Sequence, residues 1–462
     1  MTGRFLATIA GAGGHPGPYE LALDPERSTL DTARLVAARA EAARIDALFV
    51  PDLLEFGAQG TIGAQEPLVF VAALSQVTTH AGLIATVSTT FHHPFNLARM
   101  FGTLDHVSNG RAAWNLVTSS IGERNFGAGD LPSPEQRYAR AAETLDVVNA
   151  LWDSWRPGAL RPGPDGRAIL DPALIRPIDH AGDHFTIEGP LNIPPLPQGR
   201  PVLIQSGQSA AGIALGARYA EIVFTALPSL ADAHRFTGAI RSQAAAHGRT
   251  GLPLIFSSFH ATYGATEAEA QRLVRDRLAA IDYDAGRALV ADMLGGGVDL
   301  SEAKLDDPLP SSLLPDLASL NRRRGRAEIF SRLIRDGRTL RELVQAAQDT
   351  GHWSVAGTPE QLADAVEERF RAGVLDVLSL NGLADDREHD FVVNGLLPEL
   401  RRRGIVKPDY RGTLRENLGL PALQPAAVSV SQSAAISTSQ SATIPTSQSA
   451  TISTSKPAAS SR

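Results

Sequence analysis

The sequence contains no cysteine among its 462 residues. Disulfide bonds, thiolate metal sites and a cysteine nucleophile are therefore excluded together. The absence is compatible with a reducing compartment, and we expect a cytoplasmic protein. The stretch Met1–Phe5 lacks a long apolar run behind a basic start, so no signal peptide is expected.

Long apolar runs and an excess of positive charge are also missing. No segment has 18 or more uninterrupted apolar residues, so we expect no transmembrane helix. The formal net charge is -7, and Lys and Arg do not cluster with interleaved aromatic residues. Nucleic acids and anionic membranes bind basic faces, so we expect neither as a main partner. The remaining composition, 43% hydrophobic and 20% charged, is typical of a globular protein.

The composition changes sharply near residue 420. Three tandem octapeptides without charge or aromatic residues follow: Ser431–Thr438, Ser439–Thr446 and Ser447–Thr454. Such a stretch cannot bury enough apolar surface to offset its ordering entropy. We therefore expect one domain over residues 1–420 and a disordered, low-complexity tail over residues 421–462.

Short apolar runs alternate with helical patterns along the body of the chain. The expected strands are Phe5–Gly11, Ile45–Val50, Leu83–Thr89, Ala112–Val117, Val202–Gln205, Glu221–Thr225, Leu254–Tyr263 and Asp376–Asn381. The expected helices include Thr29–Arg44, Leu68–Thr79, Asn96–Val107, Glu135–Trp155, Ser209–Tyr219, Thr266–Ala280 and Pro359–Ala372. Eight largely apolar strands alternating with helices predict a closed (β/α)8 barrel, with an open doubly wound sheet as the alternative.

Two connections are too long for plain crossovers, namely Trp155–Pro201 and Ile281–Gly357. Long connections on a barrel usually cover or shape the mouth of the active site, which lies at the carboxyl ends of the strands. The polar residues expected there are mostly neutral hydrogen-bonding groups: Asp52, Thr89, Thr90, His92, His93, Asn115, Thr118, Ser119, Ser206, Gln208, Ser209, His260 and Asn381. This set suits an uncharged planar heterocycle with a phosphate better than a metal or a sugar.

Ser209 begins an expected helix after Ser206-Gly207-Gln208. Small residues let a ligand approach the backbone, and helix N-terminal N–H groups favour an anion, although a plain Ser N-cap explains the residue equally. The segment Gly207–Ala211 also nearly matches G-x-S-x-G, so a serine hydrolase with His260 or His352 is a further alternative. His92-His93 is not a metal pair, because adjacent strand residues point apart, and we expect no metal site.

Four longer strings carry a family resemblance. They are STTFHHPFNLARMFGTLDHVSNGRAAWNLVTSSIGERNFG at 88–127, GDHFTIEGPLNIPPLPQGRPVLIQSGQSAAG at 182–212, GTPEQLAD at 357–364 and YRGTLRENLGL at 410–420. The chain resembles the luciferase-like flavin monooxygenases of the nitrilotriacetate, EDTA and dibenzothiophene-sulfone monooxygenase group. The resemblance runs from about residue 4 to residue 420, with the matching strings in the same order.

The resemblance implies a bacterial-luciferase-like TIM barrel with long insertions. It implies an oxygenase component that takes reduced FMN from a separate NAD(P)H-dependent flavin reductase and uses O2 to oxygenate a small organic substrate. C–N or C–S cleavage is a typical outcome, and the subunits usually form homodimers or homotetramers. A relative that binds flavin without catalysis is the alternative function.

The resemblance also assigns cofactor-binding residues. Asp52 matches an Asp beside the flavin ring, Thr90 a flavin-contacting Thr, and Asn115 an Asn lining the ring. Tyr138 and Ser209, with Ala210 beside it, match the groups around the FMN phosphate. His92, His93 or His260 would adjust protonation or bind an acidic substrate, because His titrates near neutral pH.

The sequence departs from the family in three places. Pro134 stands where a His usually precedes the Tyr by four residues, and the loops Ala10–Tyr19 and Leu53–Glu66 look short.

Overall fold

A computed structural model describes residues 5–12, 29–55, 65–127, 129–165 and 167–423 of the chain. The predicted tail, residues 421–462, lies outside the described residues except for its first three positions. Most of the two loops compared above, Ala10–Tyr19 and Leu53–Glu66, also lies outside them.

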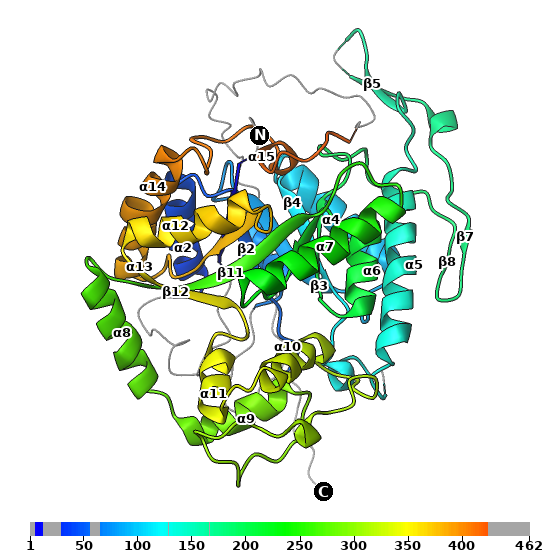
Figure 1. Ribbon diagram of the computed structural model, residues 1–462. Coiled ribbons are helices and arrows are strands. Elements are labelled where there is room, and N and C mark those ends of the chain that lie inside the picture. The colour runs from blue at the N-terminus through cyan, green and yellow to red at the C-terminus, as the bar shows by residue number, and fades with distance from the viewer. Residues whose placement is uncertain (1–4, 13–28, 56–64, 128, 166, 424–462) are drawn as a thin grey trace, which may run out of the picture. The chain divides into compact units, whose positions relative to one another are not determined.

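Eight parallel strands close into a barrel (Figure 1). Around the barrel their order is β10, β9, β4, β3, β2, β1, β13 and β11, and β11 closes the ring by pairing with β10. Their bounds are β1 Ala7–Gly11, β2 Ala47–Val50, β3 Gly82–Ser88, β4 Ala112–Val117, β9 Val202–Ser206, β10 Ile222–Phe224, β11 Leu254–Tyr263 and β13 Val377–Leu380. The predicted (β/α)8 barrel is confirmed, and the open sheet is excluded.

Alternation along each strand fills the barrel interior. Every second residue of a strand points inward. Ile9, Ile84, Ile204 and Ile222 belong to one buried interior cluster. Leu414 and Leu418 join the same cluster, where Leu414 belongs to the short helix α15 (Leu414–Asn417). The amino-terminal end of the barrel is thus packed with side chains, and only the carboxyl end is left for a ligand.

Helices surround the barrel. Those beside the strands are α2 Thr29–Ala42, α3 Pro67–Leu74, α4 Pro94–Val107, α5 Pro134–Trp152, α6 Ala210–Tyr219, α7 Leu230–Ala246, α12 Pro359–Arg371, α13 Asp386–Asp390, η4 Phe391–Leu396 and α14 Leu397–Arg402. Several begin where the sequence supplies a cap. The Ser133 hydroxyl accepts from Gln136 N at 3.2 Å, and Pro134 occupies the first position of α5, where no helical N–H bond is lost.

The connection Trp155–Pro201 contains two small antiparallel hairpins. These pair β5 (Leu160–Pro162) with β6 (Ala168–Leu170), and β7 (His180–Ala181) with β8 (Thr186–Ile187).

The connection Ile281–Gly357 carries helices of its own, which the sequence did not reveal. They are α9 Tyr283–Met293, α10 Arg324–Arg335 and α11 Leu340–Gln348, preceded by α8 Glu267–Ala279. Val290, Phe330, Leu343 and Val344 form the centre of a separate hydrophobic cluster within this insertion. In Figure 1, α9, α10 and α11 lie at the opposite end of the barrel from α15. The insertion therefore stands at the carboxyl ends of the strands, as predicted for a long connection.

Strand β11 belongs to two sheets. Its first half pairs with β10 and β13, whereas Phe259–Tyr263 pair with β12 (Trp353–Gly357), a strand within the second insertion. The end of β11 therefore leaves the barrel wall, with consequences for His260 below.

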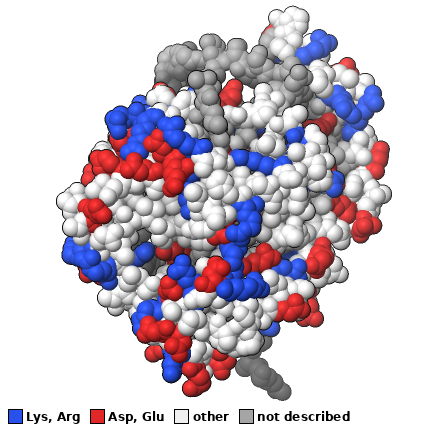
Figure 2. All heavy atoms as spheres, viewed as in Figure 1, with Lys and Arg blue, Asp and Glu red and all other residues white. Residues whose placement is uncertain are grey.

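Acidic and basic side chains are interspersed on the face drawn in Figure 2, and neither sign forms one continuous field there. In the described part of the chain, no helix combines the length and apolar character needed to cross a membrane.

Candidate active site

A cavity of about 490 Å³ lies at the carboxyl ends of the barrel strands. Its size is within the range common for small-molecule sites. Phe49 and Phe224 line it. Both pack on Phe256 beneath them, with ring centroids 6.3 and 4.6 Å from the Phe256 ring. These rings give the cavity an apolar base on which a flat heterocycle can rest.

Three neighbouring strands are joined by polar side chains on one wall. The Asn115 amide of β4 donates to Thr86 Oγ1 of β3 at 3.0 Å and accepts from the Ser206 hydroxyl of β9 at 2.8 Å. All three residues line the cavity. Asn115 is buried, and these two bonds set the direction of its amide.

The start of α6 forms a narrow cradle. A Cβ on Gly207 would lie 2.6 Å from Gln205 Nε2 and 3.0 Å from the Tyr138 hydroxyl, and a Cβ on Gly212 would lie 3.1 Å from the same hydroxyl. Ser209 is the N-cap of α6, and its hydroxyl accepts from Gly212 N at 3.3 Å. The two glycines thus let the Tyr138 hydroxyl approach the N-terminus of α6, and a hydroxyl beside helix N–H groups suits an anion.

Two buried groups beside this cradle have no hydrogen-bond partner within the described structure. They are the amide of Gln205 and the Nε of Arg137. Arg137 donates its other nitrogens to Pro132 O and to Asn321. Burial lowers the pKa of Arg137, as expected for a cation without a carboxylate partner. A phosphate would supply the negative charge that Arg137 lacks and acceptors for the N–H groups at the start of α6, so the cradle fits the phosphate end of FMN.

The second insertion closes the cavity. Asn321, Arg323, Arg324, Gly325 and Arg326 line it. A Cβ on Gly325 would lie 3.0 Å from Gln208 Cγ, so this segment lies directly against the start of α6.

The same segment is fixed to the loop after β4. Asn321 Nδ2 donates to Leu131 O at 3.0 Å, and Arg322 donates to Ser120 O at 2.6 Å and to Glu123 Oε1 at 2.5 Å. These bonds hold the wall that residues 321–326 add to the cavity.

Pro134 lines the cavity as the first residue of α5. It cannot donate a hydrogen bond. Of the arginines that line the same cavity, Arg137 lies one turn along α5 and Arg324 comes from the insertion. Arg324 is held beside Pro134 by a 2.9 Å bond to Glu135. Positive charge is therefore present where Pro134 supplies none.

Asp52 lines the cavity just after β2. Burial, with a smaller contribution from the nearby charge of Glu66, raises the pKa of Asp52 to about 6. A backbone hydrogen bond from Leu53 and the charge of His92 act in the opposite direction. Asp52 therefore changes its protonation within a pH range in which enzymes are assayed.

Substituting Asp52 by Asn should remove a pH-dependent part of the stability. Because the folded-state pKa lies above the ordinary Asp value of 3.8, the contribution of Asp52 is fully present below that value and is lost as pH rises through about 6. Between about pH 4.5 and 7.5 the wild type should lose about 1 kcal/mol relative to Asp52→Asn, roughly half the unscreened effect because Asp52 is partly exposed. Urea unfolding of both proteins at the two pH values measures this difference, and parallel stabilities would contradict it.

The predicted cofactor residues fall into two places. Asp52, Asn115, Tyr138 and Ser209 line the one cavity, and Ala210 is the first residue of α6 beside it. Thr90 lines a neighbouring pocket, and its hydroxyl donates to Thr118 O at 3.0 Å. Thr118 lines the main cavity, so Thr90 holds part of its wall.

The structure does not bring the predicted catalytic histidines into the main cavity. His92 and His93 line an apolar groove with α3 and α4. Nδ1 of His92 lies 2.9 Å from Ser88 O. His93 is the N-cap of α4, where its Nδ1 accepts from Phe95 N at 3.3 Å. The placement of His93 is that of a helix cap.

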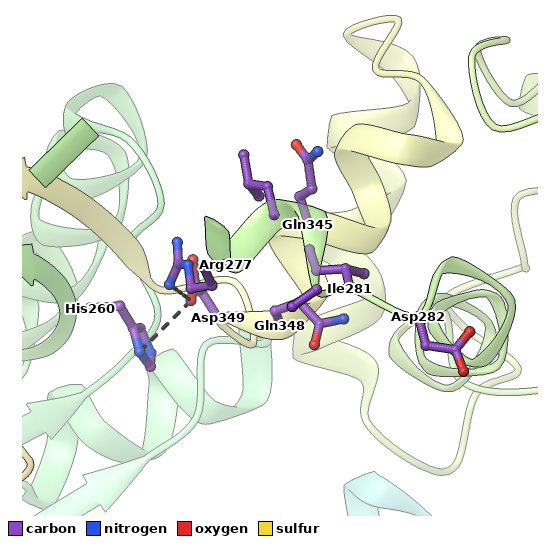
Figure 3. A pocket seen from close by; sticks show the side chains of 9 residues that line it. His260, Arg277, Ile281, Asp282, Gln345, Gln348 and Asp349 are labelled. Atoms are coloured by element: carbon purple, nitrogen blue, oxygen red, sulfur yellow. Dashed lines mark hydrogen bonds and ion pairs between the residues drawn. The ribbon is translucent and has the colours of Figure 1, made fainter. Parts of the chain in front are cut away.

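His260 lies in a third pocket, on the part of β11 that has left the barrel. In Figure 3 its ring points toward Asp349, with Nδ1 3.8 Å from Oδ1, and Arg277 approaches the same oxygen at 3.3 Å. His352 lies beside it, with ring centroids 6.0 Å apart. The sequence identified the strand correctly but not the point at which it departs from the barrel.

The serine hydrolase alternative has no support in this geometry. Within the described residues no histidine hydrogen-bonds to the Ser209 hydroxyl, which serves as the cap of α6. His260 and Ser209 line different pockets. Across the same described residues, no three His, Asp or Glu side chains are grouped to hold a metal ion.

Sequence reasoning missed the arginines of this site. Arg137 adjoins Tyr138, and the run Asn321–Arg326 contains four arginines in six residues. That run was a visible pattern within a connection expected to shape the site. Its place against α6, however, depends on how the insertion folds.

These features define a (β/α)8-barrel protein with a ligand cavity at the carboxyl ends of its strands. The family described as luciferase-like monooxygenase matches residues 4–376, and the chain belongs to it. It is a monooxygenase, an oxidoreductase of the kind that uses reduced FMN.

Individual relatives agree with this assignment. The chain is 36% identical over 423 residues to N-acetyl-S-(2-succino)cysteine monooxygenase of Bacillus subtilis (strain 168), covering 89% of this chain and 95% of that protein. It is 41% identical over 363 residues to nitrilotriacetate monooxygenase component A of Aminobacter aminovorans, covering 77% and 79%. The crystal structure of a riboflavin lyase with modified FMN and riboflavin matches with a TM-score of 0.78 at 28% identity, covering 91% and 97%.

Proposed function

We propose that this chain is the oxygenase component of a two-component monooxygenase. It takes reduced FMN from a separate NAD(P)H-dependent flavin reductase and oxygenates a small organic substrate with O2, and C–N or C–S cleavage follows in suitable substrates. The observation that carries the proposal is the cradle at the start of α6, where Gly207 and Gly212 let the Tyr138 hydroxyl approach the helix N-terminus that Ser209 caps, with Tyr138 and Ser209 both lining the cavity.

The residues of the chain have separate tasks in this proposal. Reduced FMN, when bound, supplies the two electrons with which one oxygen atom of O2 enters the substrate and the other leaves as water. Tyr138, Ser209 and the first N–H groups of α6 bind its phosphate. Asn115 and Asp52 orient the ring from two sides of the cavity. Residues 321–326 exclude water, which favours oxygenation over loss of reduced oxygen species to solvent.

The histidines take only supporting parts in this proposal. The charge of His92 acts on Asp52, so His92 can adjust the protonation of Asp52. His93 and His260 line other pockets. Exchanging each of these two for Ala should leave product formation per FMN oxidised unchanged.

The proposed function is tested with the purified chain, FMN, NADH, O2 and a flavin reductase of any source. Candidate amines and thioethers are supplied, and oxygenated or cleaved product is measured by mass spectrometry. We expect product only when the reductase and O2 are both present. Tight FMN binding without product from any substrate would instead support a relative that binds flavin but has lost catalysis.

We expect the active protein to be a homodimer or homotetramer, as the family resemblance implies. Light scattering of the purified chain measures its mass directly, and a monomer at micromolar concentration would contradict this expectation.

A further inference from the structure

Arg326 is a cation in the cavity with no acidic partner. It is the third residue of α10, lines the cavity and is only partly exposed. One guanidinium nitrogen donates to Thr350 O. No ion pair and no other hydrogen bond of Arg326 occurs among the residues that the structure describes. The remaining guanidinium nitrogens of Arg326 therefore carry N–H groups that can donate to a ligand.

The surroundings of Arg326 make this arrangement unfavourable without a ligand. Burial, with a smaller contribution from the positive charge of Arg323, lowers the pKa of Arg326 to about 10. A partly buried charge that lacks a counter-ion destabilises the folded chain, whereas a bound anion would offset that cost. Arg presents a planar fork that matches a carboxylate with two parallel hydrogen bonds.

A second unpartnered polar group lies next to Arg326. Nδ1 of His352 is buried and has no hydrogen-bond partner in the described structure. Burial and the charge of Arg326 hold the pKa of His352 well below its usual range, so the ring is neutral at pH 7. It stacks at 5.6 Å on Phe224, which lines the cavity. His352 is not among the described residues that line this cavity, and its neutral ring lies near Arg326 without adding a second positive charge.

The arginines of the cavity form two groups. The charges of Arg322, Arg324 and Glu135 act on the pKa of Arg137. Arg137 lies near the start of α5, next to Tyr138 in the sequence. The charge of Arg326 is instead coupled to Arg323 and acts on His352. A Cβ on Gly351 would lie 3.5 Å from the Arg326 guanidinium, which therefore points toward β12. The group that contains Arg137 belongs with the phosphate cradle. The group that contains Arg326 lies on the β10–β11 side of the cavity.

We propose that Arg326 forms a subsite for a carboxylate of the substrate, so that this enzyme acts on organic acids. The proposal rests on the proposed function, which places the cofactor phosphate at Tyr138 and Ser209. Arg326 is assigned here to binding and to selectivity, and not to the oxygenation step.

The test measures binding to the FMN-loaded chain by calorimetry. The probes are thiodiglycolate, succinate and nitrilotriacetate, with thiodiglycol as the neutral analogue of the first. We expect the dicarboxylate thiodiglycolate to bind roughly tenfold or more tightly than thiodiglycol, and Arg326→Gln to remove that difference. Arg326→Lys should retain part of it, because the charge remains but the fork is lost. Arg335→Gln, at the exposed end of the same helix, is the matched control and should change nothing.

Separate readouts distinguish the possible failures. The affinity for FMN, followed by quenching of flavin fluorescence, should change less than about twofold in Arg326→Gln. A roughly tenfold loss of FMN affinity would assign Arg326 to the phosphate and overturn the proposal. Unchanged acid binding in Arg326→Gln, or no binding of any of the three acids to the wild type, would also overturn it. Failure of the wild type to bind FMN would refute the proposed function instead, and carboxylate binding to the unloaded chain would still test Arg326.

Discussion

Replacing Gly207 by Val should weaken FMN binding at least about 100-fold, equivalent to about 2.7 kcal/mol. The cradle at the start of α6 has no room for a side chain at this position. A Cβ would lie 2.6 Å from Gln205 Nε2 and 3.0 Å from the Tyr138 hydroxyl, and valine adds two methyl groups beyond it. Gly207 does not have a positive φ, so the loss would come from occupied space and not from backbone strain.

The measurement is a titration of FMN followed by flavin fluorescence. Gly207→Ala should give an intermediate loss. Gly238→Ala is the control, because Gly238 lies within α7 and its Cβ would meet nothing within 4 Å. That change should leave FMN affinity as it is and stabilise the protein by about 1 kcal/mol through helix propensity. Equal FMN affinity in Gly207→Val and the wild type would refute the assignment of the phosphate cradle.

Replacing Lys407 by Met should destabilise the folded protein by about 3–5 kcal/mol. Lys407 forms an ion pair with Asp46, and both side chains are almost fully buried, with 4% and 1% of their surface exposed. Lys407 also donates to Asn417 O at 3.0 Å, and Asp46 accepts from Thr8 N at 2.8 Å. The pair thereby ties the carboxyl-terminal segment of the domain to β1 and to the start of β2. Without Lys407, the Asp46 carboxylate would remain buried without its ion-pair partner.

Chemical denaturation of the single and double variants tests this pair. Lys407→Met combined with Asp46→Asn should be more stable than Lys407→Met alone, because no unpaired charge remains. FMN affinity of whatever fraction stays folded should match the wild type, since both residues lie at the amino-terminal end of the barrel. A loss below about 1 kcal/mol in Lys407→Met would place the pair with ordinary surface ion pairs.

The barrel could be predicted because each of its strands has a recognisable local sequence pattern. Strands buried on both faces are continuous apolar runs, and the structure places all eight at the predicted positions within a few residues. The boundary of α5 at Pro134 and that of α12 at Pro359 follow from caps that are visible in the sequence. Strand β12 gave no comparable pattern, because its partner is the outer half of β11 and its pairing depends on how a long insertion folds.

The residues of the candidate site also fall into those that a local pattern placed correctly and those that it did not. Asn115 lies in the second half of β4, and Asp52 and Ser209 come shortly after β2 and β9, so the rule that strand ends converge was enough to place them together. His260 also follows that rule in sequence, but β11 leaves the barrel before reaching it and carries the side chain into another pocket. His93 lies after a barrel strand too, yet the first turn of α4 uses it as a cap.

The sequence alone determined the barrel, the family and the convergence of the strand-end residues on one cavity, because each depends on patterns a few residues long or on fixed convergence of parallel strands. Only the tertiary structure decided which arginines enter the cavity. Arg137 and Arg326 are separated by 189 residues in the chain, and they share one cavity because the second insertion packs its own small core and lays residues 321–326 against α6. No local pattern encodes that contact.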